Sequence, residues 1–190
     1  VGLDTLVHVA NGIYENCPND EAHELFKLPE FVNKMMENKW LGSKTGQGFY
    51  KKEGKDILTL DLDTLEYRAN KKASFATLEL TKTIEKPIDR FKVLVTGKDK
   101  AGDFYRKNFA SMFQYCSNRI PEITDAFYKI DDAMKAGFGW ENGPFEIWDA
   151  IGVEKGIELM KAEGYQPASW VTDMLASGNT SFYSIKDGAT

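Results

Sequence analysis

The stretch Leu41–Tyr50, which reads LGSKTGQGFY, contains residues that could bind a phosphate group. Glycine-rich loops bring backbone N–H groups close to phosphate oxygens, and a lysine adds a positive charge. The phosphate-binding loop G-x-x-x-x-G-K-[ST] requires one glycine directly before the lysine and another five residues before that glycine. Ser43 and Asn38 stand at those two positions, so the stretch does not match this loop.

The same stretch also differs from the dinucleotide-binding fingerprint G-x-G-x-x-G. Gly46 and Gly48 supply two glycines, but Lys51 stands where the third belongs. The fingerprint follows a strand and opens a helix, whereas the apolar residues of Phe31–Met36, just upstream, have helical spacing. We therefore interpret Leu41–Tyr50 as a chain reversal, in which glycines permit positive φ angles and the final Phe49-Tyr50 pair is packed.

Other residues of the chain are able to do acid–base or metal chemistry. Two histidines, His8 and His23, are too few and too irregularly spaced to indicate a metal site. Five carboxylates near one another in the sequence could act in pairs as general acid and base, but we interpret them as helix caps and surface groups. These carboxylates are Asp131, Asp132, Glu141, Glu146 and Asp149.

The composition indicates a globular protein and excludes several classes of partner. The 190 residues are 42% hydrophobic and 13% aromatic, which suffices for a packed core. The net charge of −5 provides no basic surface for nucleic acid or anionic membranes. Two cysteines indicate free thiols and a cytoplasmic location. The sequence begins with Val1 and a helical pattern follows at once, so we expect a piece of a longer polypeptide.

The elements that must position these residues are mostly helices. Hydrophobic periodicity and turn signals predict one strand at 57–62, paired with Tyr50 or Tyr67, and a basic linker at 68–74. Helices are expected at 3–14, from Pro29 through Met36, and at 74–85, 101–117, 120–136, 144–148, 154–163 and 167–176.

An internal repeat relates the two ends of the chain. Val1–Asp4 matches Ile151–Glu154, Phe31–Met36 matches Trp170–Leu175, and the pair Phe49-Tyr50 matches Phe182-Tyr183. The matches occur in the same order. The second copy loses the lysine and the glycine pair of the Leu41–Tyr50 stretch but keeps its aromatic pair, which favours packing over phosphate binding.

Taken in order, these motifs resemble the carboxy-terminal helical region of the NAD-dependent 3-hydroxyacyl-CoA dehydrogenases, most closely the fused members that also carry a crotonase-type hydratase domain. The residues that carry the resemblance include Val1–Thr5, Asn38–Tyr50 and Asp131–Met134, followed by the G-P-F-x-x-x-D pattern and Ala150–Gly152. We expect the motif residues to be structural: Gly42, Lys44, Thr45, Gly46, Gly48, Phe49, Tyr50, Gly143, Pro144, Phe145 and Asp149.

The resemblance implies a mainly α fold of tandem helical units, like the C-terminal domain of 6-phosphogluconate dehydrogenase, with a small β element. It implies that residues 1–67 form the second half of a first unit plus the β element. Residues 68–100 would be a linker with a helix, and residues 101–190 a complete second unit.

The family reaction oxidises a 3-hydroxyacyl thioester to a 3-ketoacyl thioester and passes hydride to NAD. The resemblance places the catalytic His–Glu pair and the NAD site in a nucleotide-binding domain that is not part of this sequence. An asparagine completes the family site, and its counterpart in the second unit falls near Arg106; Asn108 is turned by roughly 200 degrees on a helix, so the role is not transferred. We therefore expect no catalytic residue, bound NAD or metal in this chain.

Several alternatives remain at the sequence level. Lys44 could attract a phosphate of coenzyme A, but a solvated or helix-dipole role is favoured. An aromatic floor for an acyl chain could come from Trp140, Phe145 and Trp148, but core or interface packing is favoured. We expect the NAD-binding domain of the same polypeptide as a partner, acyl-CoA as the substrate of the parent, and self-association through exposed apolar helix faces. A hydratase domain in the same polypeptide is an alternative that the sequence leaves open. The rival hypothesis is a stand-alone interaction module without catalysis.

Overall fold

The computed structural model describes residues 2–184. Its internal contacts divide the chain into two compact units, which we call unit 1 (Val1–Ala73) and unit 2 (Ser74–Thr190). The fold is mainly α-helical with one small sheet, as expected from the sequence. Within the described residues, no helix is long and apolar enough to cross a membrane.

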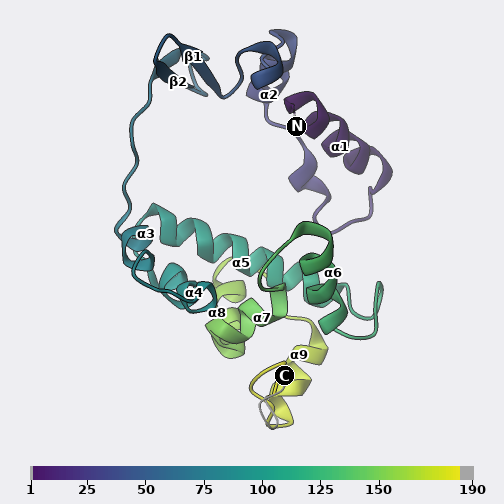
Figure 1. Cartoon of the computed structure of the whole chain (residues 1–190). Helices are drawn as coiled ribbons and strands as arrows, with labels where there is room; N and C mark the ends of the chain where they lie inside the picture. Colours follow the sequence, from purple (N-terminus) through teal and green to yellow (C-terminus); the bar gives the residue numbers. More distant parts are fainter. Residues whose placement is uncertain (1, 185–190) are drawn as a thin grey trace. The chain divides into compact units, whose positions relative to one another are not determined.

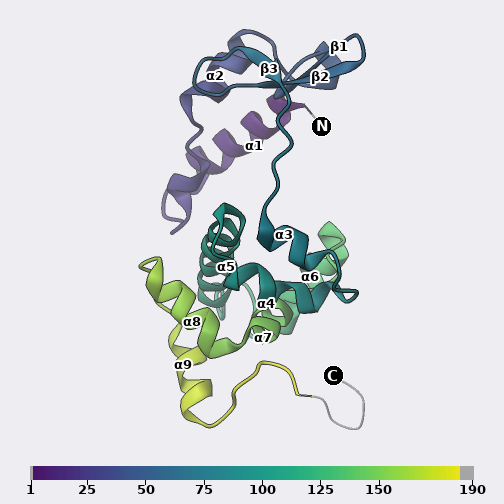
Figure 2. The same cartoon turned by 90° about the vertical axis from the view of Figure 1, so that its left-hand side faces the viewer.

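Unit 1 combines two α-helices with a three-stranded antiparallel sheet in the order β1-β2-β3 (Figures 1 and 2). The register places Tyr50 opposite Thr59 and Leu60 opposite Tyr67, so both tyrosines considered as partners of the predicted strand flank it. The core is formed by Leu3, Val32, Met35 and Leu60. The elements are α1 (Leu3–Asn16), the 3-10 turn η1 (His23–Phe26), α2 (Glu30–Glu37), the 3-10 turn η2 (Ser43–Thr45), β1 (Tyr50–Glu53), β2 (Asp56–Leu60) and β3 (Tyr67–Ala69).

Unit 2 is built around the long helix α5, which packs against α4, α7 and α8 (Figure 1). Three aromatic rings stack in sequence through its core, with centroid distances of 5.9 Å from Phe109 to Phe113 and 4.7 Å from Phe113 to Trp148. The helices are α3 (Ala76–Thr81), α4 (Pro87–Thr96), α5 (Lys100–Asn118), α6 (Tyr128–Phe138), α7 (Pro144–Ile151), α8 (Val153–Ala162) and α9 (Ser169–Ala176).

Two of the helices predicted in unit 2 differ most from the structure. We expected one helix over 74–85, but α3 ends at Thr81 and an unpredicted helix, α4, begins at Pro87. Proline suits the first turn of a helix because its missing N–H is not needed there. Since α4 packs against α5 and α7, residues that we expected to lie in the linker belong to unit 2 by their contacts.

The helix predicted at 120–136 begins only at Tyr128. Pro121 disfavours a helical conformation in Ile120. Farther along, the Thr124 hydroxyl accepts a hydrogen bond from the Ala126 backbone N–H at 3.3 Å, which stabilises a turn in place of a helix. The apolar spacing that predicted this helix therefore corresponds to a helix only over the second half of the predicted range.

The internal repeat is visible in how α2 and α9 end. The Trp40 N–H donates to the Met35 carbonyl at 2.8 Å, and the Asn179 N–H donates to the Met174 carbonyl at 3.2 Å. Each pair lies 139 residues from its counterpart, the offset that the repeat predicts. A positive φ occurs just before the donor in both copies, 59° at Lys39 and 90° at Gly178. Both helices thus close with the same left-handed cap.

Candidate functional site

Asp131 on α6 is the most deeply buried carboxylate of the described chain, with no exposed surface. Its Oδ1 accepts the Phe145 N–H at 2.9 Å and its Oδ2 accepts the Glu146 N–H at 3.0 Å, so it caps the N-terminus of α7. The Tyr183 hydroxyl donates to Oδ2 at 2.9 Å. Gly143 allows this approach, because a side chain there would meet the Cβ and Cγ atoms of Asp131. Asp131 therefore joins α6, α7 and the segment after α9.

Asp149 on α7 holds the same segment from the other side. Its carboxylate accepts the Phe182 N–H at 2.8 Å and the Tyr183 N–H at 2.9 Å. Tyr183 is thus fixed by its backbone at Asp149 and by its hydroxyl at Asp131. We call these three residues, Asp131, Asp149 and Tyr183, the carboxylate cluster.

Burial governs the electrostatics of the carboxylate cluster. It raises the pKa values of Asp131 and Asp149 above the ordinary range, while the backbone N–H donors lower them in part. The pKa of Tyr183 is raised by its own burial and by the hydrogen bond to Asp131. The two carboxylates accept hydrogen bonds from backbone N–H groups and from the Tyr183 hydroxyl within unit 2. They are therefore positioned to hold the segment after α9 in place. A general base must instead reach a proton on a substrate.

Glu146 completes the cap at the start of α7. Glu146 accepts the Gly143 N–H at 2.8 Å with one oxygen, and its other oxygen lies 2.7 Å from the Lys135 ammonium. Asp132 lies 3.7 Å from the same lysine. The interpretation of these carboxylates as helix caps is confirmed for Asp131 and Glu146, but their placement as surface groups is wrong for Asp131, which is buried.

Of the three aromatic residues weighed as an acyl floor, Phe145 and Trp148 are fully buried and Trp140 is partly exposed. Phe182 lies 5.0 Å from both buried rings, measured between centroids. The Trp148 indole N–H donates to the Val153 carbonyl at 3.0 Å. The expectation of core packing is confirmed for Phe145 and Trp148.

The Leu41–Tyr50 stretch forms a compact turn in unit 1. Gly42 and Gly46 have φ angles of 107° and 80°, which confirms that its glycines permit positive φ. The Gly42 N–H donates to the Gln47 carbonyl at 2.8 Å. A Cβ atom at Gly48 would lie 2.8 Å from the Gly42 backbone, so the two sides of the turn are in close contact. This geometry closes the loop on itself.

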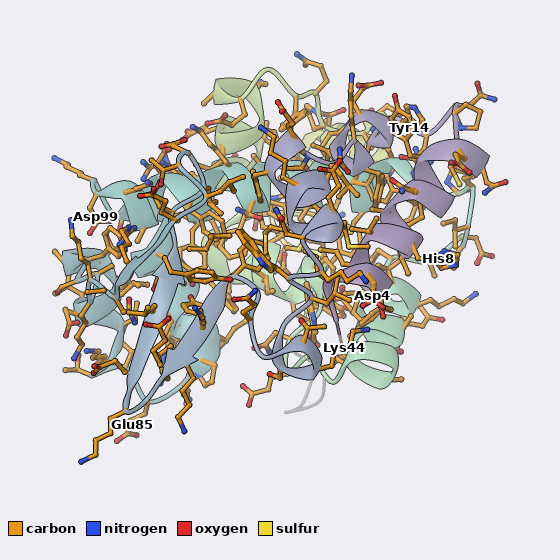
Figure 3. All side chains as sticks on the ribbon, turned by 90° about the horizontal axis from the view of Figure 1, so that it is seen from above. Asp4, His8, Tyr14, Lys44, Glu85 and Asp99 are labelled. Carbon is orange, nitrogen blue, oxygen red and sulfur yellow. The ribbon has the colours of Figure 1, made fainter. Side chains whose placement is uncertain are left out.

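The side chains of this turn are also engaged within unit 1. Both oxygens of Asp4, in the first turn of α1, lie 2.5 to 2.6 Å from the Lys44 ammonium, and Figure 3 labels the two residues. The hydroxyl of Thr45 accepts the Leu41 N–H at 3.0 Å. The pair lowers the pKa of Asp4 through its hydrogen bond to Lys44. Lys44 thus forms an ion pair at a helix N-terminus, where a lone cation would be unfavourable.

The remaining candidates make contacts within their own units. His23 stacks on Tyr14 with centroids 4.1 Å apart, and Figure 3 shows Tyr14 and His8 on α1. Arg106 donates to the carbonyls of Val95 and Gly97, which fastens the end of α4 to α5. The Asn108 amide donates to the Phe104 carbonyl of its own helix at 2.9 Å. No group of three or more metal-ligating side chains is found among residues 2–184.

Sequence reasoning missed two polar connections. The link between Asp131 and Tyr183 spans 52 residues and has no local signal. The second is the N-cap of α5, where Asp99 accepts the Gly102 N–H at 3.0 Å and also the Thr77 N–H at 2.9 Å. An aspartate before a helical pattern is a common N-cap signal, so this cap was recognisable.

Comparisons with known proteins show which family the sequence resembles. Residues 109–184 match the family model of the 3-hydroxyacyl-CoA dehydrogenase C-terminal domain. The whole chain is 43% identical to a probable 3-hydroxyacyl-CoA dehydrogenase of Bacillus subtilis, of which it spans 24%. It is 26% identical over 152 residues to a putative fatty acid oxidation complex trifunctional enzyme of Rickettsia felis, spanning 20% of that protein. It is 29% identical over 197 aligned residues to the fatty acid oxidation complex subunit alpha of Psychrobacter cryohalolentis, spanning 24% of it. The chain thus spans about a quarter of the length of these relatives.

Proposed function

The chain carries the C-terminal domain of a 3-hydroxyacyl-CoA dehydrogenase, and we propose that it is the helical part of such an enzyme that does not bind NAD. The parent enzyme oxidises 3-hydroxyacyl-CoA to 3-ketoacyl-CoA in fatty-acid β-oxidation. The chain contributes closure of the substrate cleft and packing between domains or subunits. The observation that carries this proposal is the carboxylate cluster, which lies within the matched residues and fastens helices together.

Two observations support placing the NAD site in another part of the parent. The glycine-rich turn of unit 1 precedes β1, whereas a dinucleotide fingerprint follows a strand and opens a helix. The turn is also closed by its own hydrogen bonds, and Lys44 is paired with Asp4. The glycine-rich turn therefore does not fit this cofactor, and we assign it no step in hydride transfer.

The test compares this chain with its full parent polypeptide. We expect the parent to form NADH from 3-hydroxybutyryl-CoA and NAD, and the chain alone to form none. Calorimetric titration of the chain with NAD should give no binding heat, while circular dichroism should show a helical, cooperatively melting protein. Turnover by the chain alone would contradict the proposal, and so would an inactive parent.

The parent sequence offers a second test. We expect it to contain a strand followed by G-x-G-x-x-G, and further domains beyond this chain, since the chain spans only 20% of the trifunctional relative. A polypeptide without this fingerprint would favour the stand-alone interaction module. We also propose that the chain self-associates through apolar helix faces, which sedimentation over a range of concentrations would measure.

A further inference from the structure

Unit 2 carries an apolar pocket of about 650 Å³ between the last turn of α5 and the first two turns of α6. This volume lies within the range of about 300–1,000 Å³ that is usual for pockets that bind small molecules. All of its lining residues lie between positions 115 and 134, so the pocket is formed entirely within unit 2. The apolar part of the lining consists of Tyr115, Cys116, Ile123, Ile130, Ala133 and Met134.

Two of the polar lining residues are engaged by their neighbours. The Thr124 hydroxyl accepts the Ala126 N–H at 3.3 Å. Nη1 of Arg119 lies 2.7 Å from Oε2 of Glu122, and the same guanidinium lies over the Tyr115 ring at 5.0 Å from its centroid. The walls are therefore mainly hydrocarbon. An aliphatic chain needs no hydrogen bond from such walls, so the pocket favours it over a polar ligand.

Lys129 provides a positive charge at the opening of the pocket. Its side chain is 52% exposed, and its ammonium lies 3.0 Å from Oδ1 of Asp125, whose side chain is 84% exposed. An exposed pair of this kind contributes little stability, so the ammonium can turn to another anion. The lining carries two cations, Arg119 and Lys129, against the single anion Asp125, although the whole chain has a net charge of −5. The opening therefore favours an anionic head group over a cationic one.

The inner wall determines which end of such a ligand enters. Cys116 packs against the core of unit 2, and Ile130 does the same from α6. The charge of Asp131 acts on this wall, since it contributes to the raised pKa of the Cys116 thiol. A carboxylate at this end would be repelled by that charge and would lose its water. The hydrocarbon chain must therefore point inward.

We propose that this pocket binds a medium-chain fatty acid as its carboxylate, with the chain against Cys116 and Ile130 and the head group beside Lys129. The free acid differs from the thioester substrate of the parent enzyme. The proposal therefore does not depend on the proposed function.

The first experiment titrates the full chain with hexanoate, octanoate, decanoate, dodecanoate and tetradecanoate in a calorimeter, each below its micelle concentration. We expect the affinity to rise about fourfold for each added methylene until the pocket is full, and to level off for longer chains. Decyltrimethylammonium has the chain of a medium-length ligand but a cationic head group. It should bind at least about fivefold more weakly than decanoate.

Two pairs of variants locate the site. Ala133→Trp fills the pocket from α6, whereas Ala136→Trp adds the same ring at an exposed position of α6 that does not line the pocket. Lys129→Gln removes the charge at the opening. Its control is Lys107→Gln on α5, because the Lys107 side chain is 56% exposed and its ammonium lies 3.0 Å from Asp103. Circular dichroism melting verifies that all four variants are folded.

We expect Ala133→Trp to lower the affinity for decanoate at least about tenfold and Lys129→Gln to lower it roughly two- to fivefold. Both controls should bind as the unmodified chain does. Equal losses in Ala133→Trp and Ala136→Trp, or equal binding of decanoate and decyltrimethylammonium, would overturn the proposal. So would an affinity that rises with chain length without levelling off, or the absence of binding by every alkanoate.

Discussion

At the scale of single residues, the close contact between Gly156 and Trp148 determines how α7 and α8 meet. Gly156→Ala would push a Cβ into the buried indole and disturb its hydrogen bond to Val153. Overpacking of this kind costs about 1–3 kcal/mol, which outweighs the gain of about 1 kcal/mol from replacing a helical glycine. We expect the free energy of unfolding to fall by up to about 2 kcal/mol, measured by urea titration.

The matched control is Gly137→Ala on α6. A Cβ at this position meets no atom within 4 Å, so only the helix propensity changes. We expect the free energy of unfolding to stay the same or rise by up to about 1 kcal/mol. If both variants lose the same stability, the contact with Trp148 is not the cause.

The two cysteines should differ strongly in reactivity. Cys17 is exposed. Burial, reinforced by the charge of Asp131, raises the pKa of Cys116 to about 12. Because the thiolate is the reactive form, we expect iodoacetamide at pH 8 to label Cys17 long before Cys116. Peptide mass spectrometry measures both rates, and labelling in denaturant should make them similar. Rapid labelling of Cys116 in the folded chain would show that its burial is wrong.

Asp99 should make the free energy of unfolding depend on pH in the acid range. The N–H groups of Thr77 and Gly102 lower its pKa to about 2 from an ordinary value of 3.8. A carboxyl with a depressed pKa stabilises the fold above its unfolded pKa and loses this contribution as the pH falls through its folded pKa. We expect Asp99→Asn to lower the free energy of unfolding near pH 6, and the difference from the parent chain to shrink between pH 4 and pH 2.

A suitable control for this pH series is Asp89→Asn, which removes one acidic charge from the first turn of α4. Urea titrations at each pH give the free energies for all three proteins. A difference between Asp99→Asn and the unmodified chain that stays constant down to pH 2 would mean that the carboxylate does not make these hydrogen bonds in solution.

At the scale of elements, the two equivalent helix ends differ in the residue that has positive φ. Lys39 lies two residues after the last residue of α2 and has a φ of 59°, a conformation that costs a residue with a side chain roughly 1 kcal/mol. Gly178 lies two residues after the last residue of α9 and has a φ of 90° at no such cost. We expect Lys39→Gly to raise the free energy of unfolding by about 0.5–1 kcal/mol, measured by urea titration of the circular dichroism signal.

The reciprocal variant tests the same cap in unit 2. Gly178→Lys should lower the free energy of unfolding by about 1 kcal/mol. Opposite signs for the two variants would confirm that the caps are equivalent. A loss of stability in Lys39→Gly would instead show that the lysine side chain makes a contribution larger than the strain of its backbone.

At the scale of the whole molecule, the division into two units predicts where proteases cut. Lys71 and Lys72 are exposed and lie outside helices and strands, at the boundary between unit 1 and unit 2. Exposed, irregular segments are the preferred sites of proteolysis. We expect brief trypsin treatment to release two pieces of roughly 70 and 120 residues, identified by mass spectrometry. The double variant Lys71→Gln, Lys72→Gln should resist this cleavage, and early cuts within α5 would contradict the division.

The sequence by itself determined the helical character, the strand before the linker and the family resemblance. Each of these depends on patterns that are short or repeated: apolar residues at helical spacing, glycines in the Leu41–Tyr50 turn, and the recurring Phe-Tyr pair. Local propensity and spacing suffice for such features, because the residues that produce them are neighbours in the chain. Pro87 at the start of α4 and Asp99 at the N-cap of α5 are also local signals of this kind, and both could have been recognised in the sequence.

Only the tertiary structure decided which polar groups are buried and what they hold. Asp131 and Asp132 are adjacent in the sequence, yet the first is fully buried and the second exposed. Their burial differs because α6 directs only Asp131 toward the start of α7 and toward Tyr183, which is 52 residues away in the sequence. Likewise, Phe49 and Phe182 look alike in sequence, but Phe182 is buried against α7, whereas Phe49 is 39% exposed. Burial depends on which distant elements pack together. A buried carboxylate can hold several elements in place only where such packing brings N–H and O–H donors within hydrogen-bond distance of it.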